Sequence, residues 1–329
     1  MTTTVALCGA GRVAALHAHG FVNSGATIVA VADPRRAAAR RFADEFGGPD
    51  VEVYPDLAAL LNARRPDIVA IATPHDVHAE QAIAALRAGC DVFIDKPLAT
   101  NLPDAQRVAD EVGAAARRLA VCHNLLQHEA VAAAAELLAD GRLGTILAAN
   151  AWSLGWLDLA PWDFRLDAAR TGGGAWIDNA PHLIYTLEHL LGPFTDLVAR
   201  TGAAPSRIGG EDTAVAIGRI RDEIAVSIRI SYSYVAPGSQ QAWPSGWSQG
   251  VEINGSRGSL WLSVSPSGRL RHVVGDAAEW IEQDFAEPFA ATFERTIAAF
   301  LAARADPAHT ATTAQDSLRV LALTLGALA

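Results

Sequence analysis

Residues 4–21, TVALCGAGRVAALHAHGF, give the strongest indication of the fold. A short apolar run of β-type residues leads directly into Gly9-Ala10-Gly11-Arg12-Val13-Ala14, and a helix-prone segment follows. This is G-x-G-x-x-A between a strand and a helix, where the glycines permit a tight turn and a close approach of the backbone to a pyrophosphate. The helix N-terminus adds N–H donors and partial positive charge. We therefore predict a dinucleotide site formed by Gly9, Gly11, Arg12 and Val13.

A second apolar run, ATIVAVAD, ends on Asp33, near the spacing at which an acid meets the adenosine ribose. A carboxylate at this point accepts hydrogen bonds from both ribose hydroxyls and repels a 2′-phosphate, which favours NAD over NADP. Arg35 and Arg36 follow at once and are able to stack on adenine or to bind that phosphate, so NADP remains possible. Asp33 is also placed to be the N-cap of the next helix, a role that is compatible with ribose binding.

Strands and helices alternate up to about residue 123. We expect strands at 66–74, 90–95 and 119–123, and helices at 56–65, 78–89 and 102–118. This alternation predicts right-handed βαβ units on a parallel, doubly wound sheet, with ligands bound outside the carboxyl ends of the strands. Asp33, Thr73, Lys96 and Asn124 all fall at such ends, so we expect them to line one crevice.

The pattern changes after this point, because most of the remaining segments have the character of strands joined by short turns. We therefore predict two domains, an α/β Rossmann domain over residues 1–122 and an α+β domain over residues 123–329. The second domain is expected to contain a large, mostly antiparallel open sheet, and its C-terminal helix has the option of packing back on the first domain. Because few helices are expected to pack on this sheet, one of its faces would be left exposed to solvent. We therefore predict a homodimer or homotetramer in which a second subunit packs on that face.

Composition narrows the class of protein further. The net charge of −10 gives no electrostatic signature for nucleic acid or for an anionic membrane, and 50% hydrophobic residues suit a packed globular chain. The first residues do not resemble a signal peptide, and the apolar runs are too short for a membrane helix. Cys8, Cys90 and Cys122 are isolated from one another, which is typical of buried free thiols in a reducing cytoplasm.

Three segments carry the residue types needed for chemistry. FIDKPLA sets Lys96 just past a strand, and HNLLQHEA lies at the end of the last Rossmann strand. TGGGAWIDNAPH places Asp178 four residues before His182. On a helix that spacing puts both side chains on one face. A lysine, an aspartate and a histidine beside a nicotinamide would supply a proton acceptor, a group that tunes it and a cation that orients a hydroxyl. No further ligand completes a metal set around Asp178 and His182, so no metal is expected.

These motifs, in this order and over nearly the whole chain, resemble the Gfo/Idh/MocA family, the group of glucose-fructose oxidoreductase and inositol dehydrogenase. The resemblance implies that Lys96 holds the reacting hydroxyl, that His182 accepts its proton and that Asp178 contacts substrate. It also implies cofactor contacts by the turn after the fourth strand and by Asp95, and a substrate contact by Arg165. The tryptophans just before Arg165, Trp152 and Trp162 among them, would form an apolar wall against a sugar or cyclitol ring. The expected cofactor contacts are Gly9, Gly11, Arg12, Val13, Asp33, Arg35, Thr73, Pro74, His75, His78, Asp95 and Lys96. The expected substrate contacts are Asn124, Trp152, Trp162, Arg165, Asp178 and His182.

The sequence departs from the family pattern at two places. Asp95-Lys96-Pro97 stands where the family usually has Glu-Lys-Pro, and Asn179-Ala180-Pro181 separates Asp178 from His182 where a glycine is usual. A proline inside a helix removes an N–H and crowds the preceding turn. We therefore expect the helix either to begin near Asn179 or to be kinked there. A beginning near Asn179 would place His182 at a positive helix end and favour its neutral form.

The expected function is NAD(P)-dependent interconversion of a secondary alcohol and a ketone on a sugar, cyclitol or related polyol. Two other functions stay open. One is a glycosidase that oxidises its substrate transiently with NAD and then eliminates the leaving group. The other is a non-catalytic, nucleotide-sensing regulator.

Overall fold

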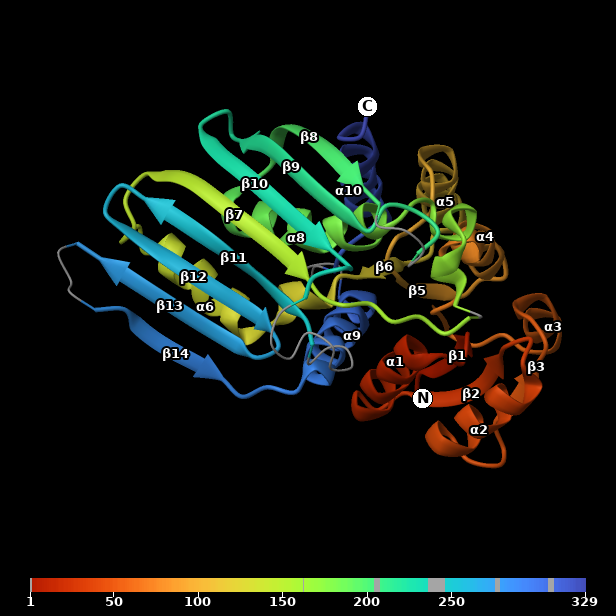
Figure 1. Cartoon of the computed structure of the whole chain (residues 1–329). Helices are drawn as coiled ribbons and strands as arrows, with labels where there is room; N and C mark the ends of the chain where they lie inside the picture. The colour runs from red at the N-terminus through yellow and green to blue at the C-terminus, as the bar shows by residue number, and fades with distance from the viewer. Residues whose placement is uncertain (1, 162, 204–207, 236–245, 276–278, 307–310) are drawn as a thin grey trace. The chain divides into compact units, whose positions relative to one another are not determined.

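The computed structural model describes residues 2–161, 163–203, 208–235, 246–275, 279–306 and 311–329. The chain divides into two compact units (Figure 1). The first contains Met1–Asn124 and Ala290–Arg319, and the second contains Leu125–Phe289 and Val320–Ala329. Each unit has its own sheet and its own apolar core, so each is described separately.

The first unit is built on a six-stranded parallel sheet in the order β3-β2-β1-β4-β5-β6, as expected for the Rossmann arrangement. Its strands are β1 (Thr4–Cys8), β2 (Thr27–Ala32), β3 (Glu52–Tyr54), β4 (Ile68–Ile71), β5 (Asp91–Asp95) and β6 (Leu119–Cys122). Its helices are α1 (Arg12–Asn23), α2 (Arg36–Phe46), α3 (Leu57–Ala63), the 3-10 turn η1 (His75–Val77), α4 (His78–Arg87) and α5 (Leu102–Ala115). The predicted doubly wound α/β fold is confirmed.

The central strands are buried along most of their length because helices cover both faces of a parallel sheet. All four residues of β4 are buried, and so are the first four of β5. The helix expected after Asp33 begins at Arg36 with Arg35 as its N-cap, so the expected N-cap role of Asp33 is wrong. Asp33 instead accepts a hydrogen bond from the backbone N–H of Arg35.

A late segment of the chain also belongs to this unit. Helix α9 (Phe289–Ala305) packs so closely on α1 that a Cβ at Gly20 would lie 2.5 Å from the side chain of Ile297. Its far end is tied to β5 by an ion pair between Arg304 Nε and Asp91 Oδ2 at 2.6 Å. The first unit is therefore completed by residues far from it in sequence. Helix α10 (Ala314–Gly326) begins in this unit and ends in the second.

The second unit is built on an eight-stranded sheet in the order β14-β13-β12-β11-β7-β10-β9-β8. Its strands are β7 (Ile146–Leu154), β8 (Phe194–Gly202), β9 (Thr213–Ile220), β10 (Ile224–Ser231), β11 (Ser248–Gly255), β12 (Gly258–Ser265), β13 (Gly268–Val274) and β14 (Ile281–Phe285). Its helices are η2 (Asn124–Gln127), α6 (Glu129–Ala139), η3 (Phe164–Leu166), α7 (Ala168–Thr171) and α8 (Ala175–Leu191). Neighbouring strands are antiparallel except β7 and β10, which confirms the predicted open sheet.

Helices α6 and α8 cover one face of this sheet, and no described helix of the unit covers the other face (Figure 1). In β9 and β10 buried and more exposed residues alternate, as in a sheet covered on one side. Trp176 of α8 is fully buried and donates its indole N–H to the carbonyl of Thr324 in α10 at 2.8 Å. Within the described part of the chain, no helix is long and apolar enough to cross a membrane.

Candidate active site

The turn between β1 and α1 has the geometry of a phosphate-binding loop. Gly9 has φ +100°, and a Cβ there would lie 2.5 Å from the carbonyl oxygen of Ala72, so the turn requires glycine. At Gly11 the opposite holds, because a Cβ would meet no described atom within 4 Å. Gly11 is the N-cap of α1 and gives it no side-chain hydrogen bond. The open space and the exposed helix start fit the pyrophosphate of a dinucleotide.

Asp33, at the end of β2, fixes this loop from the side. Its Oδ2 accepts from the backbone N–H of Ala10 at 2.9 Å, and its Oδ1 accepts from that of Arg35 at 2.8 Å. The Arg35 guanidinium lies 3.1 Å from the same carboxylate. Burial raises the pKa of Asp33, but the hydrogen bonds from Arg35 and Ala10 outweigh it and leave the pKa below its usual value. The Asp33 carboxylate is thus ionised and lies beside the turn between β1 and α1.

His78 connects two segments that were expected to contact the cofactor. Its Nδ1 lies 2.7 Å from the carbonyl oxygen of Pro97 and its Nε2 lies 2.9 Å from that of Thr73. The side chain is fully buried, and burial lowers its pKa. His78 has no exposed surface and links the β4–α4 turn to the segment after β5. Its expected contact with the cofactor stays a prediction.

Around the ends of β5 and β6 the candidate residues differ in exposure. Asp95 ends β5, and Lys96 follows it with a partly exposed side chain. Thr73 and Pro74 are also partly exposed, whereas His75 is 4% exposed. Asn124 is buried, and its amide donates to the Thr292 hydroxyl of α9 at 2.9 Å. Asn124 therefore already has a partner inside the first unit.

In the second unit, three glycines shape the start of α8. Gly172 ends α7 with φ +81°, and Gly173 has φ +153°. A Cβ at Gly174 would lie 2.0 Å from the carbonyl oxygen of Glu211, so this position admits no side chain. The Glu211 carboxylate accepts from the N–H groups of Gly174 and Trp176, both at 3.0 Å. The glycines thus allow a remote loop to cap the helix that carries Asp178 and His182.

The expectation that this helix begins near Asn179 is wrong. Helix α8 runs from Ala175 to Leu191 and contains Pro181 in its interior. Every residue from Ala175 to Pro181 is buried, so packing against the sheet maintains the helix despite the missing N–H. His182 therefore lies well inside the helix, and an effect of the positive helix end on its protonation no longer applies. Asp178 is the residue that lies in the first turn.

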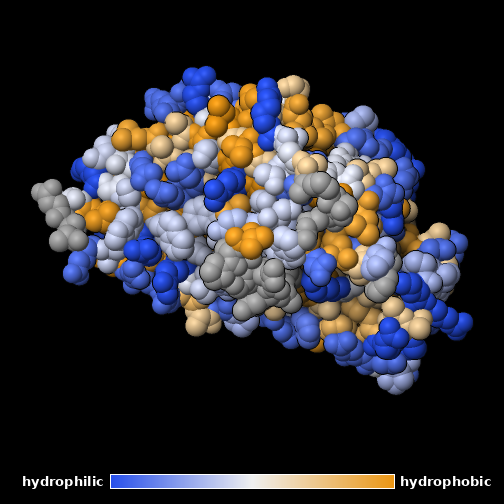
Figure 2. Space-filling model, viewed as in Figure 1, coloured by the Kyte–Doolittle hydropathy of each residue, from blue (hydrophilic) through white to orange (hydrophobic). Residues whose placement is uncertain are grey.

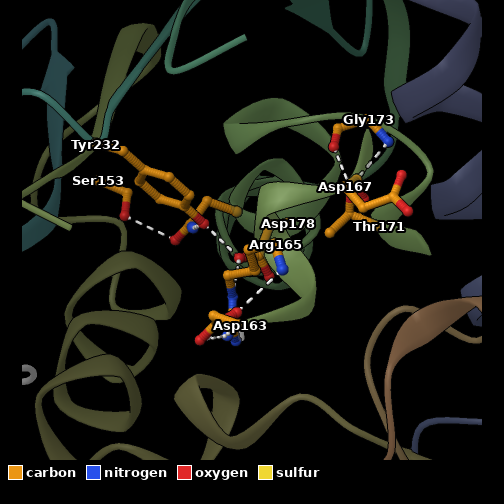
Figure 3. A network of polar contacts seen from close by, with 9 residues as sticks. Ser153, Asp163, Arg165, Asp167, Thr171, Gly173, Asp178 and Tyr232 are labelled. Carbon is orange, nitrogen blue, oxygen red and sulfur yellow. Dashed lines mark hydrogen bonds and ion pairs between the residues drawn. The ribbon is translucent and has the colours of Figure 1, made fainter. Parts of the chain in front are cut away.

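Asp178 is the centre of a polar network that Figure 3 shows. Its Oδ2 accepts from the Tyr232 hydroxyl at 2.5 Å, and the same oxygen lies 3.4 Å from Arg165 Nε. Arg165 also pairs with Asp163, at 3.2 Å. Burial, and next the charge of Asp178, raise the pKa of Tyr232 well above its usual value, so its hydroxyl stays a donor. Asp178 is 6% exposed and is held in one orientation by these partners.

Asn179 extends the network to the sheet. Its amide donates to the hydroxyl of Tyr232, and its side-chain oxygen accepts from the Ser153 hydroxyl of β7 at 2.9 Å. This gives a structural reason for one residue of the unusual Asn179-Ala180-Pro181 segment. Tyr232, just after β10, was not predicted from the sequence, because it lies 54 residues from Asp178 with no motif around it.

The expected aromatic wall receives a different placement. Ser153 faces α8, so its neighbour Trp152 points to the opposite, uncovered face of the sheet. There Trp152 stacks on Trp261, with ring centroids 5.6 Å apart, and donates to the Ser248 hydroxyl. Within the second unit Trp152 therefore lies on the opposite face of the sheet from Asp178, and its expected substrate contact stays a prediction. Trp162 lies outside the described residues. Arg165 does join Asp178.

Comparison with known proteins agrees with both halves of the chain. Residues 3–123 match the model described as "Oxidoreductase family, NAD-binding Rossmann fold", and residues 131–261 match the GFO/IDH/MocA C-terminal domain. D-apiose dehydrogenase of Paraburkholderia graminis is 30% identical over 80% of this chain and 69% of its own. Inositol 2-dehydrogenase of Rhizobium meliloti is 27% identical over 98% and 95%. The solved complex of levoglucosan dehydrogenase with NADH and levoglucosan superposes with a TM-score of 0.87, at 20% identity, over 99% of this chain and 97% of that one.

The match of the Rossmann unit to the oxidoreductase family model places the protein among the NAD(P)-dependent oxidoreductases. The chain belongs to the Gfo/Idh/MocA family of oxidoreductases. It is a dehydrogenase or reductase that acts on CH–OH groups.

Proposed function

We propose that this enzyme interconverts a secondary alcohol and a ketone on a sugar, cyclitol or related polyol. The observation that carries the proposal is the buried Asp178, held by Arg165 and Tyr232 one helical turn before His182. Such an arrangement suits a group that must keep its charge and orientation next to a histidine base. The names of relatives give the substrate class, because D-apiose, inositol and levoglucosan are all sugars or polyols.

Three side chains have proposed roles in the reaction. His182 removes the proton of the reacting hydroxyl, and Lys96 holds the same oxygen and stabilises its developing negative charge. Asp178 contacts substrate, and its negative charge stabilises the protonated imidazole of His182 that forms in the reaction. When bound, the nicotinamide supplies the acceptor for the hydride that leaves the carbinol carbon.

We propose NAD as the preferred cofactor. Gly9, Gly11, Arg12 and Val13 would hold the pyrophosphate at the start of α1, and Asp33 would bind the ribose hydroxyls. Because Asp33 is ionised beside the loop, it opposes a 2′-phosphate. Arg35 is 62% exposed at its side chain and remains available to the adenosine end. Thr73, Pro74, His75, Asp95 and Lys96 are proposed to contact the cofactor farther along.

The proposal is tested by a panel of sugars and inositols with NAD and with NADP, following the absorbance of the reduced nicotinamide. Formation of NADH with a member of the panel supports it. Hydrolysis of a glycoside without net NADH would instead indicate the glycosidase, and binding of nucleotide without any turnover would indicate a regulator.

We also propose a homodimer or homotetramer formed through the uncovered face of the eight-stranded sheet. Val198, Val215 and Ile217, on β8 and β9, are 46%, 48% and 66% exposed on this face. Figure 2 shows apolar surface over the region where Figure 1 places β8 to β10. Contiguous exposed apolar residues are typical of an interface between subunits. A cytoplasmic location is proposed as well, on the strength of three buried free thiols.

A further inference from the structure

His17 of α1 is a buried polar side chain without a hydrogen-bond partner. It is fully buried, and neither ring nitrogen has a partner among the described residues. Phe93 lies against it at 5.0 Å between ring centroids, and Phe293 at 5.9 Å. Burial lowers its pKa to about 3, so the imidazole is neutral and each nitrogen loses its bonds to water without replacement. A buried group of this kind calls for a partner that the protein chain alone does not provide.

Two more groups with metal-binding atoms lie next to this imidazole. Asp95 ends β5 and Cys122 ends β6, and the two residues are directly paired across the parallel strands. The Nε2 atom of His17 is 4.0 Å from Asp95 Oδ1. One ligand atom from each of the three residues lies within 4.8 Å of the other two. The helix and the sheet thus bring together three donors that are 78 and 27 residues apart in the sequence.

We propose that His17, Asp95 and Cys122 bind a divalent transition-metal ion of the zinc type. Imidazole, carboxylate and thiolate are all zinc ligands, and three protein ligands leave a fourth position for water. Zinc bonds are about 2.0–2.3 Å long, so the three atoms would have to close on the ion by about half an ångström each. This site is separate from Asp178 and His182, where no metal is expected.

The charges of the proposed site balance. On binding, the Cys122 thiol releases its proton to solvent and its sulfur bonds to the metal, while His17 binds through a neutral nitrogen. One thiolate and one carboxylate then neutralise the two positive charges of the ion, which makes burial far less costly. Without a metal, burial and the charge of Asp95 raise the pKa of Cys122 well above its usual value, so the thiol stays protonated and inert.

Another buried cysteine, Cys90, provides a matched control. Cys90 is also a buried free thiol, yet no cluster of metal ligands includes it in the described part of the chain. Cys90→Ser removes a thiol of similar burial and leaves the proposed ligands intact. Cys122→Ser and His17→Gln each remove one ligand with little change in side-chain size.

The experiment uses the full chain after chelator treatment, titrated with Co²⁺ as the probe and then with Zn²⁺. We expect one Co²⁺ per chain, a thiolate-to-cobalt charge-transfer absorption, and its loss when Zn²⁺ is added. Cys122→Ser is expected to abolish the absorption and to weaken binding at least about 100-fold, whereas Cys90→Ser keeps both. Circular dichroism of each variant in chelator verifies that it is folded.

Failure to bind metal in stoichiometric amount would overturn the proposal, as would an absorption that persists in Cys122→Ser. If Cys122→Ser does not fold, X-ray absorption of the zinc-loaded wild-type chain decides the question. One sulfur neighbour with nitrogen and oxygen neighbours supports the site, and a shell without sulfur refutes it.

Discussion

Asp178 receives its partners from two segments on either side of it in the chain. Arg165 comes from the 3-10 turn η3, and Tyr232 directly follows β10. The carboxylate is nearly buried, so these two contacts replace the water that an exposed carboxylate would have. At the residue scale, the candidate site therefore depends on Tyr232 and Arg165 as positioning residues for Asp178.

Replacing Tyr232 by Phe tests this role. The change removes the hydroxyl that donates to Asp178 and keeps the ring, and a hydrogen bond to a buried charge is worth about 1.5–3 kcal/mol. We expect kcat to fall about 10- to 100-fold, with the pH profile of kcat displaced and NAD affinity retained. Ser259→Ala, which removes another hydroxyl hydrogen bond of the same sheet, is the control and should leave kcat and its pH profile unchanged. Unchanged kcat in Tyr232→Phe would contradict the role.

Asp33 is expected to set the choice of cofactor. Asp33→Ala removes the carboxylate proposed to accept the ribose hydroxyls, so NAD affinity should fall at least about tenfold. NADP affinity should fall less, because the repulsion of its 2′-phosphate disappears as well. Fluorescence titration with NADH and NADPH measures both affinities, and equal losses for the two would indicate mere distortion of the loop. Asp67→Ala, which affects a carboxylate at the opposite ends of the strands, is the control.

The sequence predicted single residues where spacing carried the information. The pattern from Gly9 to Ala14 correctly predicted the tight turn between β1 and α1, and a separation of four sufficed to place Asp178 and His182 on one helix. Tyr232 could not be found in this way, because its partnership with Asp178 exists only after the sheet has formed. The face of the sheet on which Trp152 lies could not be predicted for a related reason, since a strand's two faces are distinguished only once its neighbours are known.

At the scale of the element, the start of α8 depends on space that only glycine leaves. Gly174→Ala would place a methyl group 2.0 Å from the carbonyl oxygen of Glu211, so the capping loop must move. We expect the free energy of unfolding to fall by about 1–3 kcal/mol or more. Urea unfolding followed by circular dichroism measures the change.

Gly113→Ala is the matched control in helix α5. No described atom lies within 4 Å of a Cβ at this position, so the change only reduces the freedom of the unfolded chain. It should raise the free energy of unfolding by about 0.4–1 kcal/mol. A Gly174→Ala protein as stable as wild type would refute the role given to this glycine.

Helices and strands with a clear hydrophobic pattern were predicted from the sequence. Those whose formation depends on packing against other elements were not. The helix expected at 78–89 is found as α4, His78–Arg87. The three-residue strand β3 was missed, because its Glu52 and Tyr54 do not form an apolar run. Pro181 misled the prediction in the other direction, since its local cost is outweighed by burial of the surrounding helix.

For the whole molecule, His17 makes stability depend on pH. In the folded chain its pKa is about 3, whereas an unfolded histidine has a pKa near 6.5. Between these values the unfolded state binds one proton more, so the free energy of unfolding falls as the pH falls from 6.5 towards 3, by about 1.4 kcal/mol per pH unit from this group. Urea unfolding in the presence of chelator measures this dependence. The free energy of unfolding of His17→Gln should fall less steeply than that of the wild type as the pH is lowered from 6.5 to 3. An equal slope in both proteins would contradict the assignment.

The uncovered face of the large sheet should hold the assembly together. Ile217→Glu introduces a charge where the side chain is 66% exposed in the single chain, so it should leave each subunit folded and separate the subunits. Light scattering after size-exclusion chromatography gives the mass of each species. Val22→Glu, on α1 at 42% exposure, is the control and should keep the wild-type mass. A wild-type protein that is monomeric at all concentrations would rule out this interface.

The most direct test of the proposed catalysis is the rate of nicotinamide reduction in wild type, His182→Ala and His189→Ala, with a sugar or polyol found in the panel. His189 is an exposed histidine of the same helix, so it controls for the loss of an imidazole from α8. We predict that His182→Ala lowers kcat by about 10²- to 10⁴-fold with NAD binding retained, and that His189→Ala keeps the wild-type rate. Equal rates in all three proteins, or no conversion of any sugar or polyol in either direction by the wild type, would contradict the proposal.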